Sequence, residues 1–379
     1  MRTLEPILPA NGRDSLIEVI KLTKKFDEVM AVDDVSFNLH QGELFGFLGP
    51  NGAGKTTTIN MLTGLSRPDS GTIRIASHEC SKNPKAAQHM IGVVPDESNL
   101  YPDLSGFGNL CFCASLYGMH KNDRERRAKK LLETFRLKEA ADRKFAGYSK
   151  GMKRKLTIAA GIIHNPQILF LDEPTTGIDV ASARQIRQLI AALHRTGTTI
   201  FLTTHYIEEA ERLCERIAFI VKGQIVRIDT VKNLLQPEQQ RKVMLISVLN
   251  SAKELCSKLA GAFPHFEFQP VSDEQIRIES AEPIRLSPLF RFIEDHDAEV
   301  TEARRLSPSL EDVFMQITGI EADTSKKEPE KKGVSHEKMD TFLEHFIKGH
   351  ACLLSQTAKH QLGFDFSCSL DKHVFYQIR

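Results

Sequence analysis

The chain has 379 residues, of which 41% are hydrophobic, enough for a sizeable core and as a prior for two to three domains. Its 50 basic and 49 acidic side chains leave a net charge of +1, which gives no sign of a nucleic-acid-binding protein. No apolar run reaches the roughly 18 to 20 residues of a membrane span, and the first residues lack the apolar block of a signal peptide.

Between residues 17 and 235, short apolar runs alternate with helical patterns. Several runs are bounded by turn residues or charge, as strands buried on both faces should be. This alternation favours a mostly parallel sheet covered by helices. The Lys222-Gly223 pair between two runs predicts a β-hairpin. The strand candidates are 17–22, 44–48, 72–75, 91–94, 168–172, 199–203 and 216–221, and the helix candidates include 57–65, 123–135 and 181–194.

A polar break at residues 236–241 predicts a domain boundary. We therefore expect an N-terminal extension at 1–16, a first domain at 17–235, a smaller α+β domain at 239–320, and a linker and tail at 321–379. In the smaller domain, strand candidates are 243–249, 275–279 and 299–304, and the last helix starts at Ser309 with Asp312 three residues on, as in a capping box.

The tail has almost nothing to bury over residues 321–335, which should be disordered, whereas 336–362 have the pattern of an amphipathic helix. Its histidines have spacings that fit no metal site. The seven cysteines of the whole chain form no C-x-x-C pair, so we expect reduced thiols and neither a metal nor a disulfide framework.

The segment GPNGAGKT at residues 49–56 matches the G-x-x-x-x-G-K-[ST] pattern of a phosphate-binding loop, between a strand and a helix candidate as the pattern requires. Glycines let the backbone wrap a phosphate, and the helix N-terminus adds its positive end. Lys55 should reach the β- and γ-phosphates and serve catalysis, and the Thr56 hydroxyl should bind Mg²⁺. The candidate ATP-binding residues here are Gly49, Pro50, Asn51, Gly52, Ala53, Gly54, Lys55, Thr56 and Thr57.

A second candidate site is the apolar strand 168–172, which ends in the carboxylates of Asp172 and Glu173. Ligands of open α/β sheets bind beyond the carboxyl ends of the strands. Asp172 can hold Mg²⁺ there through water, and Glu173 is placed to polarise an attacking water. The alternative is a solvated strand end, which the phosphate-binding loop in the same chain makes a poorer explanation.

With these motifs, the chain from residue 17 to residue 228 resembles the ATP-binding subunit of ABC transporters. Tyr148-Ser149-Lys150-Gly151-Met152 stands where that family has its LSGGQ signature, in a variant typical of daunorubicin-resistance-type and other type 2 exporters. Thr176-Gly177-Ile178-Asp179 resembles the D-loop, and Thr203-Thr204-His205 resembles the switch-histidine segment. Phe26 stands where the family stacks an aromatic ring on adenine.

The resemblance implies an α/β fold, namely a P-loop NTPase ABC cassette with a mixed central sheet, an antiparallel β subdomain and a helical subdomain, followed by a small α+β C-terminal domain. Residues 239–320, which end near LEDVF at 310–314, resemble the accessory C-terminal domain of the same exporters. Its expected role is dimer contact or regulation.

In this family, two copies face each other head to tail, and each ATP lies between the phosphate-binding loop of one copy and the signature of the other. The resemblance implies that Ser149 and the Gly151 amide contact the γ-phosphate across the dimer, with Asp179 close by. Glu173 would be the general base, and His205 would sense the γ-phosphate. Neither copy alone encloses the phosphoryl group, so hydrolysis requires closure.

Two residues depart from the family pattern. Asp96 follows Val93-Val94-Pro95 where the family usually has the Gln of its Q-loop. Its carboxylate could face Mg²⁺ directly or through water, together with Thr56 and Asp172, which could slow hydrolysis or alter its metal dependence. Lys150 replaces a signature glycine and either attracts phosphate or points outward.

We therefore expect an ATPase that uses ATP and Mg²⁺ to drive export of an unidentified substrate. Its expected partners are a second ATP-binding subunit, in a homodimer or heterodimer, and separate transmembrane permease subunits, which would hold it at the cytoplasmic face of the cell membrane. Two other classes of ATP-binding protein fit the sequence less well. A DNA- or ribosome-acting ABC ATPase would need a long coiled coil or a second cassette, and a nucleotide-gated regulatory module is favoured only by Asp96.

Overall fold

The computed structural model describes residues 15–76, 78–81, 83–235, 242–249, 252–306 and 309–319. They form two compact units, the first made of residues up to 214 with 218–226, and the second made of 215–217 with 227–319. This division puts the end of strand β10 (Gln224–Thr230) and helix α7 (Val231–Leu234) in the second unit, although the sequence suggested a boundary after residue 235. The predicted tail at 321–379 lies outside the described residues.

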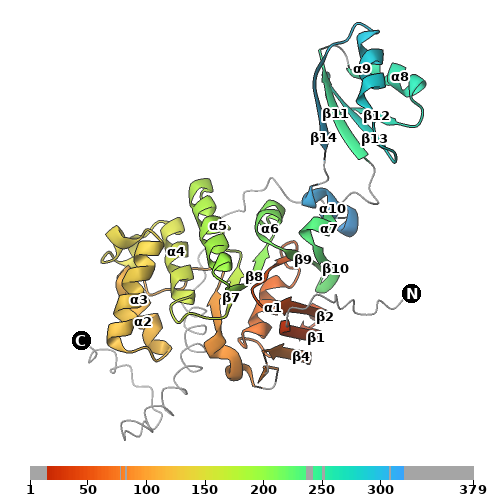
Figure 1. Cartoon of the computed structure of the whole chain (residues 1–379). Coiled ribbons are helices and arrows are strands. Elements are labelled where there is room, and N and C mark those ends of the chain that lie inside the picture. The colour runs from red at the N-terminus through yellow and green to blue at the C-terminus, as the bar shows by residue number, and fades with distance from the viewer. Residues whose placement is uncertain are drawn as a thin grey trace, which may run out of the picture. The chain divides into compact units, whose positions relative to one another are not determined.

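A six-stranded sheet forms the centre of the first unit, in the order β10-β9-β3-β8-β7-β6 (Figure 1). The strands besides β10 are β3 (Leu44–Leu48), β6 (Ile91–Val94), β7 (Ile168–Asp172), β8 (Thr199–Thr204) and β9 (Arg216–Val221). β3, β8, β7 and β6 pair in parallel, and every residue of β3, β7 and β8 is buried. Burial on both faces explains why these strands are continuous apolar runs in the sequence.

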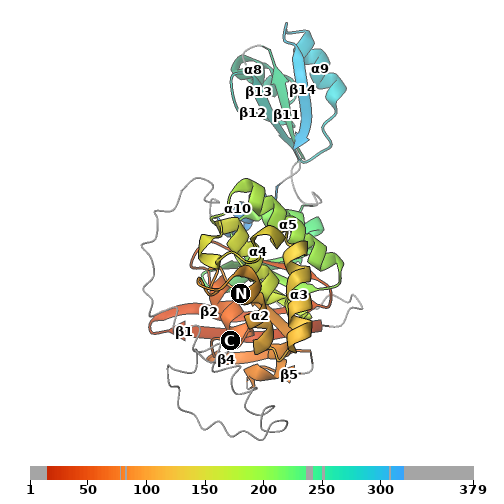
Figure 2. The ribbon, with the colours of Figure 1, turned by 90° about the vertical axis from the view of Figure 1, so that its left-hand side faces the viewer.

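A second sheet of four antiparallel strands has the order β2-β1-β4-β5, and Figure 2 shows β1, β2 and β4 as neighbours. Its strands are β1 (Ser15–Phe26), β2 (Val29–His40), β4 (Ser70–Ile75) and β5 (His78–Glu79). The sequence did not predict β2. Asp33 and Asp34 interrupt its apolar alternation, and Asp34 has a φ of 50° beside an irregularity in the β1–β2 register. The predicted antiparallel β subdomain is confirmed.

Helices surround the central sheet and form the predicted helical subdomain, made of α2, α3 and α4 (Figures 1 and 2). The α-helices of the first unit are α1 (Lys55–Leu62), α2 (Gly106–Leu116), α3 (Lys121–Thr134), α4 (Lys150–Gly161), α5 (Val180–Arg195) and α6 (Ile207–Leu213). Short 3₁₀ helices occur at Pro84–Met90, Lys138–Ala140 and Phe145–Gly147. The predicted helices at 123–135 and 181–194 correspond to α3 and α5 within two residues.

Two of the candidate motifs begin helices. Ser149 caps α4, where its side chain accepts a hydrogen bond from the backbone N–H of Met152. Asp179 caps α5 by accepting from the backbone N–H of Ser182 at 2.9 Å. Both residue types are favoured caps because their side-chain oxygens satisfy N–H groups that the first turn leaves free. The signature and the D-loop therefore lie at helix N-termini.

The second unit contains a β-α-β-β-α-β arrangement, whose antiparallel sheet has the order β12-β13-β11-β14. The elements are β11 (Lys242–Val248), α8 (Ala252–Ala262), β12 (Glu267–Pro270), β13 (Gln275–Ser280), α9 (Leu286–Glu294) and β14 (Val300–Leu306). Alternate residues Met244, Ile246 and Val248 pack with apolar residues of both helices in one core. The predicted α+β domain is confirmed.

The second unit ends in α10 (Leu310–Thr318), which packs on α7. Its predicted capping box is confirmed, because Ser309 accepts from the backbone N–H of Asp312 and Asp312 accepts from that of Ser309. Gly319, with a φ of 66°, ends the helix in the left-handed conformation that glycine favours. Across the described ranges, no helix combines the length and apolar character needed to cross a membrane.

Candidate functional site

Backbone packing requires the two glycines that define the phosphate-binding loop. A Cβ atom on Gly49 would lie 2.2 Å from the Ile220 carbonyl oxygen of β9. Gly54 has a φ of 104°, and a Cβ atom on it would lie 2.4 Å from the Ala31 carbonyl oxygen of β2. Only glycine fits both positions without displacing a neighbouring strand. The loop is therefore a tightly packed turn at the carboxyl end of β3, which leads directly into α1.

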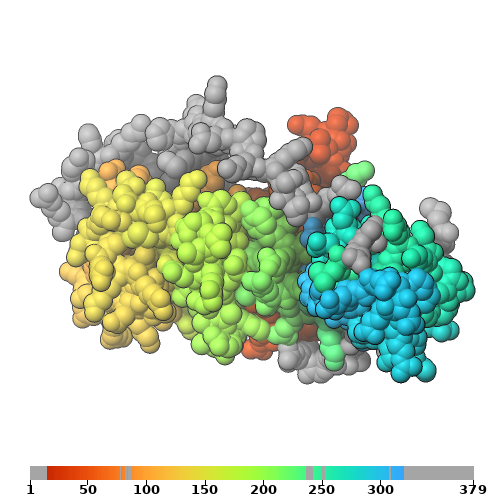
Figure 3. Space-filling view, turned by 90° about the horizontal axis from the view of Figure 1, so that it is seen from above, coloured from red at the N-terminus to blue at the C-terminus, as the bar shows by residue number. Residues whose placement is uncertain are grey.

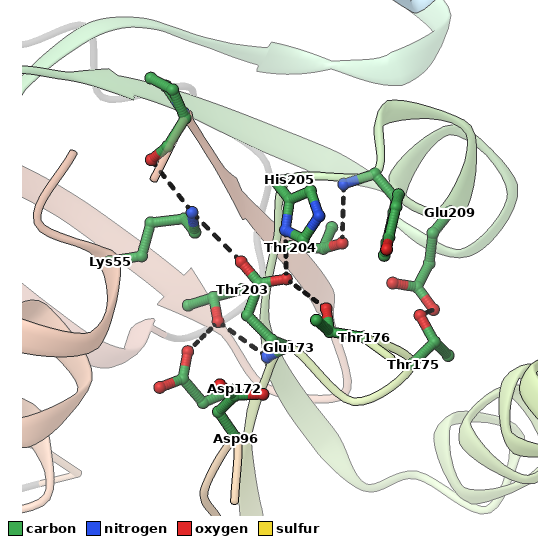
Figure 4. Close-up of polar contacts among 12 residues, drawn as sticks. Lys55, Asp96, Asp172, Glu173, Thr175, Thr176, Thr203, Thr204, His205 and Glu209 are labelled. Atoms are coloured by element: carbon green, nitrogen blue, oxygen red, sulfur yellow. Dashed lines mark hydrogen bonds and ion pairs between the residues drawn. The ribbon is translucent and has the colours of Figure 1, made fainter. Parts of the chain in front are cut away.

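Lys55 lies at the start of α1 with its side chain only 6% exposed. Its ammonium group donates to the carbonyl oxygens of Gly49 at 2.8 Å and Pro50 at 3.2 Å. The same nitrogen is 3.1 Å from Oε1 of Glu173, at the end of β7 (Figure 4). A buried positive charge is thus held between the phosphate-binding loop and the predicted general base.

The carboxylate of Asp172 ends β7 and is almost fully buried. Burial raises its pKa, while hydrogen bonds from Thr203 and Thr56 lower it. The Thr56 hydroxyl and the Asp172 carboxylate therefore lie together beside the phosphate-binding loop. Both are hard oxygen ligands, and Mg²⁺ is typically bound through one or two carboxylates plus phosphate oxygens. The predicted metal ligands Thr56 and Asp172 are chemically suited to Mg²⁺.

Glu173 is the centre of the polar network (Figure 4). Its Oε2 accepts from the Thr176 hydroxyl at 3.0 Å and lies 2.8 Å from Nδ1 of His205. Burial alone would raise the pKa of Glu173, but the His205 hydrogen bond and the Lys55 charge outweigh it and lower the pKa to about 2. The carboxylate is therefore ionised at neutral pH, and its negative charge is shared between Lys55 and His205.

The backbone of Glu173 is in the left-handed region, with a φ of 47°. Such a conformation is uncommon for a residue other than glycine, and it persists where surrounding contacts hold it. The Glu173 N–H donates to the backbone oxygen of Thr203 at 3.1 Å, and its carbonyl oxygen accepts from Arg154 at 3.3 Å. β8 and α4 therefore hold the two sides of this residue.

His205 follows β8, and its ring is partly buried beside Tyr206, with ring centroids 4.1 Å apart. Because its Nδ1 faces an ionised carboxylate, this nitrogen carries the proton and donates to Glu173. The sequence prediction placed His205 at the end of this strand, and the structure brings it into direct contact with the predicted base.

Glu209 of α6, which is buried beside the segment after Glu173, was not predicted from the sequence. Its Oε1 accepts from the Thr175 hydroxyl at 2.9 Å, and it also accepts from Thr204. Burial raises its pKa, and the nearby Glu173 carboxylate acts in the same direction. Glu209 joins the segment after Glu173 to the segment before His205. Its predecessor Glu208 is exposed, so the acidic pair resembles the solvated first turn of a helix in the sequence.

Arg154 of α4, which is only 3% exposed, was not predicted from the sequence either. Its guanidinium group donates to the carbonyl oxygens of Pro95 and Asp96, and it lies 3.5 Å from Oδ1 of Asp96. Asp96, predicted to face Mg²⁺, is thus the ion-pair partner of a buried arginine. Arg154 stands in the basic run at 153–155, which in the sequence is indistinguishable from a solvated helix face. One signal was its helical spacing of three residues from the predicted site residue Gly151.

Three residues of the signature differ in their exposure to solvent. Ser149 is exposed at the start of α4, and Lys150 beside it is exposed as well. Gly151 is buried against α5, where a Cβ atom would lie 2.4 Å from the Ser182 hydroxyl. Glycine is therefore required at this position for α4 and α5 to pack closely, and the two helices adjoin on the surface (Figure 3). Hydrogen bonds from Ser182 lower the pKa of Asp179, which keeps the α5 cap ionised.

Phe26, the predicted adenine platform, ends β1 and is 48% exposed. The Lys24 ammonium lies 5.3 Å from the centroid of its ring. Asp69 accepts from the Lys24 side chain at 2.8 Å and from the Lys25 backbone N–H at 2.7 Å. These contacts fix the end of β1 and leave an aromatic ring open to solvent, as stacking on a flat base requires.

Comparison with known proteins agrees with this geometry. Residues 32–176 match the family described as ABC transporter. The linearmycin resistance ATP-binding protein LnrL of Bacillus subtilis (strain 168) is 33% identical over 307 residues, which cover 80% of this chain and 98% of that protein. A Nod factor export ATP-binding protein I of Burkholderia thailandensis is 36% identical over 307 residues, which cover 80% and 97%.

Solved structures are similar over more than half of the chain. The ATP-binding subunit of an ABC transporter is 30% identical, with a TM-score of 0.53, and covers 58% of this chain and 92% of its own. A dimeric ATP-binding cassette in a post-hydrolysis state, bound to ADP and Pi, is 27% identical, with a TM-score of 0.52, and covers 57% and 98%. The chain therefore belongs to the ATP-binding subunits of exporter-type ABC transporters, whose cassette is an ATPase.

Proposed function

We propose that Glu173 is the general base of ATP hydrolysis. The observation that carries this proposal is the position of its carboxylate at the carboxyl end of β7, 3.1 Å from Lys55 and 2.8 Å from His205. A base between a phosphate-binding lysine and a histidine that senses the γ-phosphate lies where an attacking water must be oriented. With a pKa of about 2 in this arrangement, the carboxylate is a weak base until phosphate takes over the Lys55 ammonium.

The remaining roles follow from the same contacts. Lys55 binds the β- and γ-phosphates, and Thr56 and Asp172 hold Mg²⁺, which neutralises charge on the phosphates when it is bound. Asp96 is not among the proposed direct metal ligands, because its carboxylate is paired with Arg154. His205 donates from Nδ1 to Glu173 and orients that carboxylate. The other residues from Gly49 to Thr57 enclose the phosphates, and Phe26 stacks on adenine.

A dimer completes the site. We propose that Ser149, the Gly151 amide and Asp179 of one copy contact the ATP held by the second copy. Ser149 is exposed at a helix N-terminus, which suits contact with phosphate. One bacterial ABC transporter cassette was solved as a dimer in two structures, which are 27% and 28% identical to this chain, and this supports the arrangement.

We further propose that the dimer is bound to separate transmembrane permease subunits at the cytoplasmic face of the cell membrane and drives export. Relatives of comparable similarity are named for different functions, namely linearmycin resistance and Nod factor export. Similar ATP-binding subunits thus occur in proteins with different functions, which supports substrate selection by the membrane subunit. The linker and tail at 321–379 have no assigned part in this function.

The proposal is tested by measuring phosphate release from MgATP by the purified chain. Wild type should hydrolyse ATP, and Lys55→Ala should reduce both binding and turnover because the phosphate-binding charge is lost. Lys130→Ala, which changes an exposed lysine of α3 that is not among the candidate site residues, serves as the matched charge control and should bind ATP normally. Full turnover by Lys55→Ala would contradict the assignment of the phosphate site.

A further inference from the structure

Arg154 makes contacts with three segments that the sequence separates widely. It lies on α4, the helix that begins at Ser149. Its guanidinium donates to the carbonyl oxygens of Pro95 and Asp96, which follow β6, and to the Glu173 carbonyl oxygen at 3.3 Å, which follows β7. A planar guanidinium with five N–H donors can serve several fixed acceptors at once, whereas a lysine ammonium cannot match that geometry.

Arg154 is buried, so its positive charge depends on the groups that it contacts. A charge that is only 3% exposed requires compensation, which Asp96 provides through Oδ1 at 3.5 Å together with the three carbonyl oxygens. Asp96 itself is half-exposed, with 52% of its side chain accessible. The substitution of Asp for the usual Gln of the Q-loop is therefore matched by a cation on the signature helix.

Glu173 depends on the same guanidinium for its backbone conformation. Its left-handed φ of 47° is held by Thr203 on the N–H side, and on the carbonyl side by Arg154 together with the Thr176 backbone N–H at 3.3 Å. β8 belongs to the rigid central sheet, whereas α4 belongs to the helical subdomain. A shift of α4 therefore reaches the predicted base through the Arg154 side chain.

We propose that Arg154 is a positioning residue that couples the signature helix to Glu173 and Asp96 of the same chain. This inference rests on the proposed function, in which Ser149 of this chain contacts the ATP held by the second copy. When Ser149 of one chain contacts the ATP held by the second copy, this contact sets the position of α4. Through Arg154, α4 then sets the positions of Glu173 and of the loop after β6 in its own chain, which holds the other ATP.

The first test compares Arg154→Met and Arg154→Lys with Lys155→Met as matched control. Lys155 is a buried cation on the same helix, but its ammonium donates to Gln185 of α5. Arg154→Met should lower kcat by about 10²-fold, the effect expected when a reacting group is misplaced by about an ångström. The dissociation constant of ATP should change by less than about threefold, as for changes away from a binding site. Arg154→Lys keeps the charge without the fork, and its kcat should lie between Arg154→Met and wild type.

Thermal unfolding separates positioning from folding. Lys155→Met should keep the wild-type kcat, and Arg154→Lys should unfold close to the wild-type temperature, so that its loss of turnover cannot come from loss of fold. The proposal is overturned if both Arg154 variants keep kcat within about threefold of wild type, or if the ATP dissociation constant rises in step with the loss of kcat. If wild type itself fails to hydrolyse ATP, the proposed function fails instead.

The second test shows on which site Arg154 acts. Two heterodimers each carry Lys55→Ala in one chain, which removes that chain's ATP site. In the first heterodimer Arg154→Met is placed in the same chain as Lys55→Ala, and in the second it is placed in the other chain. If Arg154 acts on Glu173 of its own chain, only the second heterodimer should hydrolyse ATP more slowly than the heterodimer with Lys55→Ala alone. Loss confined to the first heterodimer would show that Arg154 serves only the signature, and equal loss in both would show a general structural role. Either result overturns the proposal.

Discussion

The ammonium nitrogen of Lys55 lies 3.1 Å from Oε1 of Glu173, so the predicted phosphate-binding cation and the predicted base neutralise each other. Phosphate must compete with this carboxylate for the ammonium group. Glu173→Gln should therefore tighten ATP binding, by about tenfold if the lost competition is worth about 1.4 kcal/mol. Titration with a fluorescent ATP analogue measures the dissociation constant. Glu209→Gln, which removes another buried carboxylate not paired with Lys55, should leave it unchanged. Weaker binding by Glu173→Gln would contradict this account.

The buried carboxylate of Glu209 predicts a pH-dependent stability. Burial raises its pKa in the folded state, so its ionisation destabilises the fold, and this penalty is absent below the unfolded pKa of about 4.3 and complete above the folded pKa. Glu209→Gln keeps an acceptor for Thr175 without the charge. The free energy of unfolding in urea should therefore rise for Glu209→Gln relative to wild type as the pH increases above about 4.3. Glu208→Gln, on the exposed side of the same helix, should show no such rise, and a flat difference for Glu209→Gln would refute the assignment.

Residues at the ends of parallel strands could be predicted to meet, because neighbouring strands present their carboxyl ends at one edge of the sheet. That rule correctly brought Lys55, Asp172, Glu173 and His205 together from the sequence. Arg154 could not be found in this way. Its place in a basic run suggested a solvated face, and only the packing of α4 against the ends of β6 and β7 makes it a buried partner of the site.

Helices and strands also divide into those that could be predicted from the sequence and those that could not. β3, β7 and β8 were predictable because strands buried on both faces must be apolar throughout. β2 was missed because a strand with one partly exposed face tolerates aspartates and a bulge, which erase the period-2 pattern. Helices α8 and α9 were not predicted either, since each is short and depends on the second unit's core for its stability.

The dimer proposal predicts that two inactive chains restore activity when mixed. Lys55→Ala removes the phosphate-binding charge, and Ser149→Arg blocks the signature, so each homodimer has no complete site. A heterodimer contains one site built from the intact loop of one chain and the intact signature of the other. Mixed chains, separated by two affinity tags, should regain ATPase activity that rises with the amount of heterodimer but stays below the wild-type rate per site, because Ser149→Arg also removes the contact proposed to set the base of the complete site. Purified heterodimers with no recovered activity and no ATP-dependent association would refute the arrangement.

The assignment of Glu173 as the general base is tested most directly by single-turnover hydrolysis of bound ATP. Wild type and Glu173→Gln are each loaded with labelled MgATP, and bound ATP and released phosphate are followed in the same sample. The amide is nearly isosteric with the carboxylate but cannot accept the proton of the attacking water, and loss of a general base typically costs about 10²- to 10⁴-fold in rate. The account predicts that Glu173→Gln retains bound ATP and hydrolyses it slower by that factor. Hydrolysis by Glu173→Gln at the wild-type rate would contradict it.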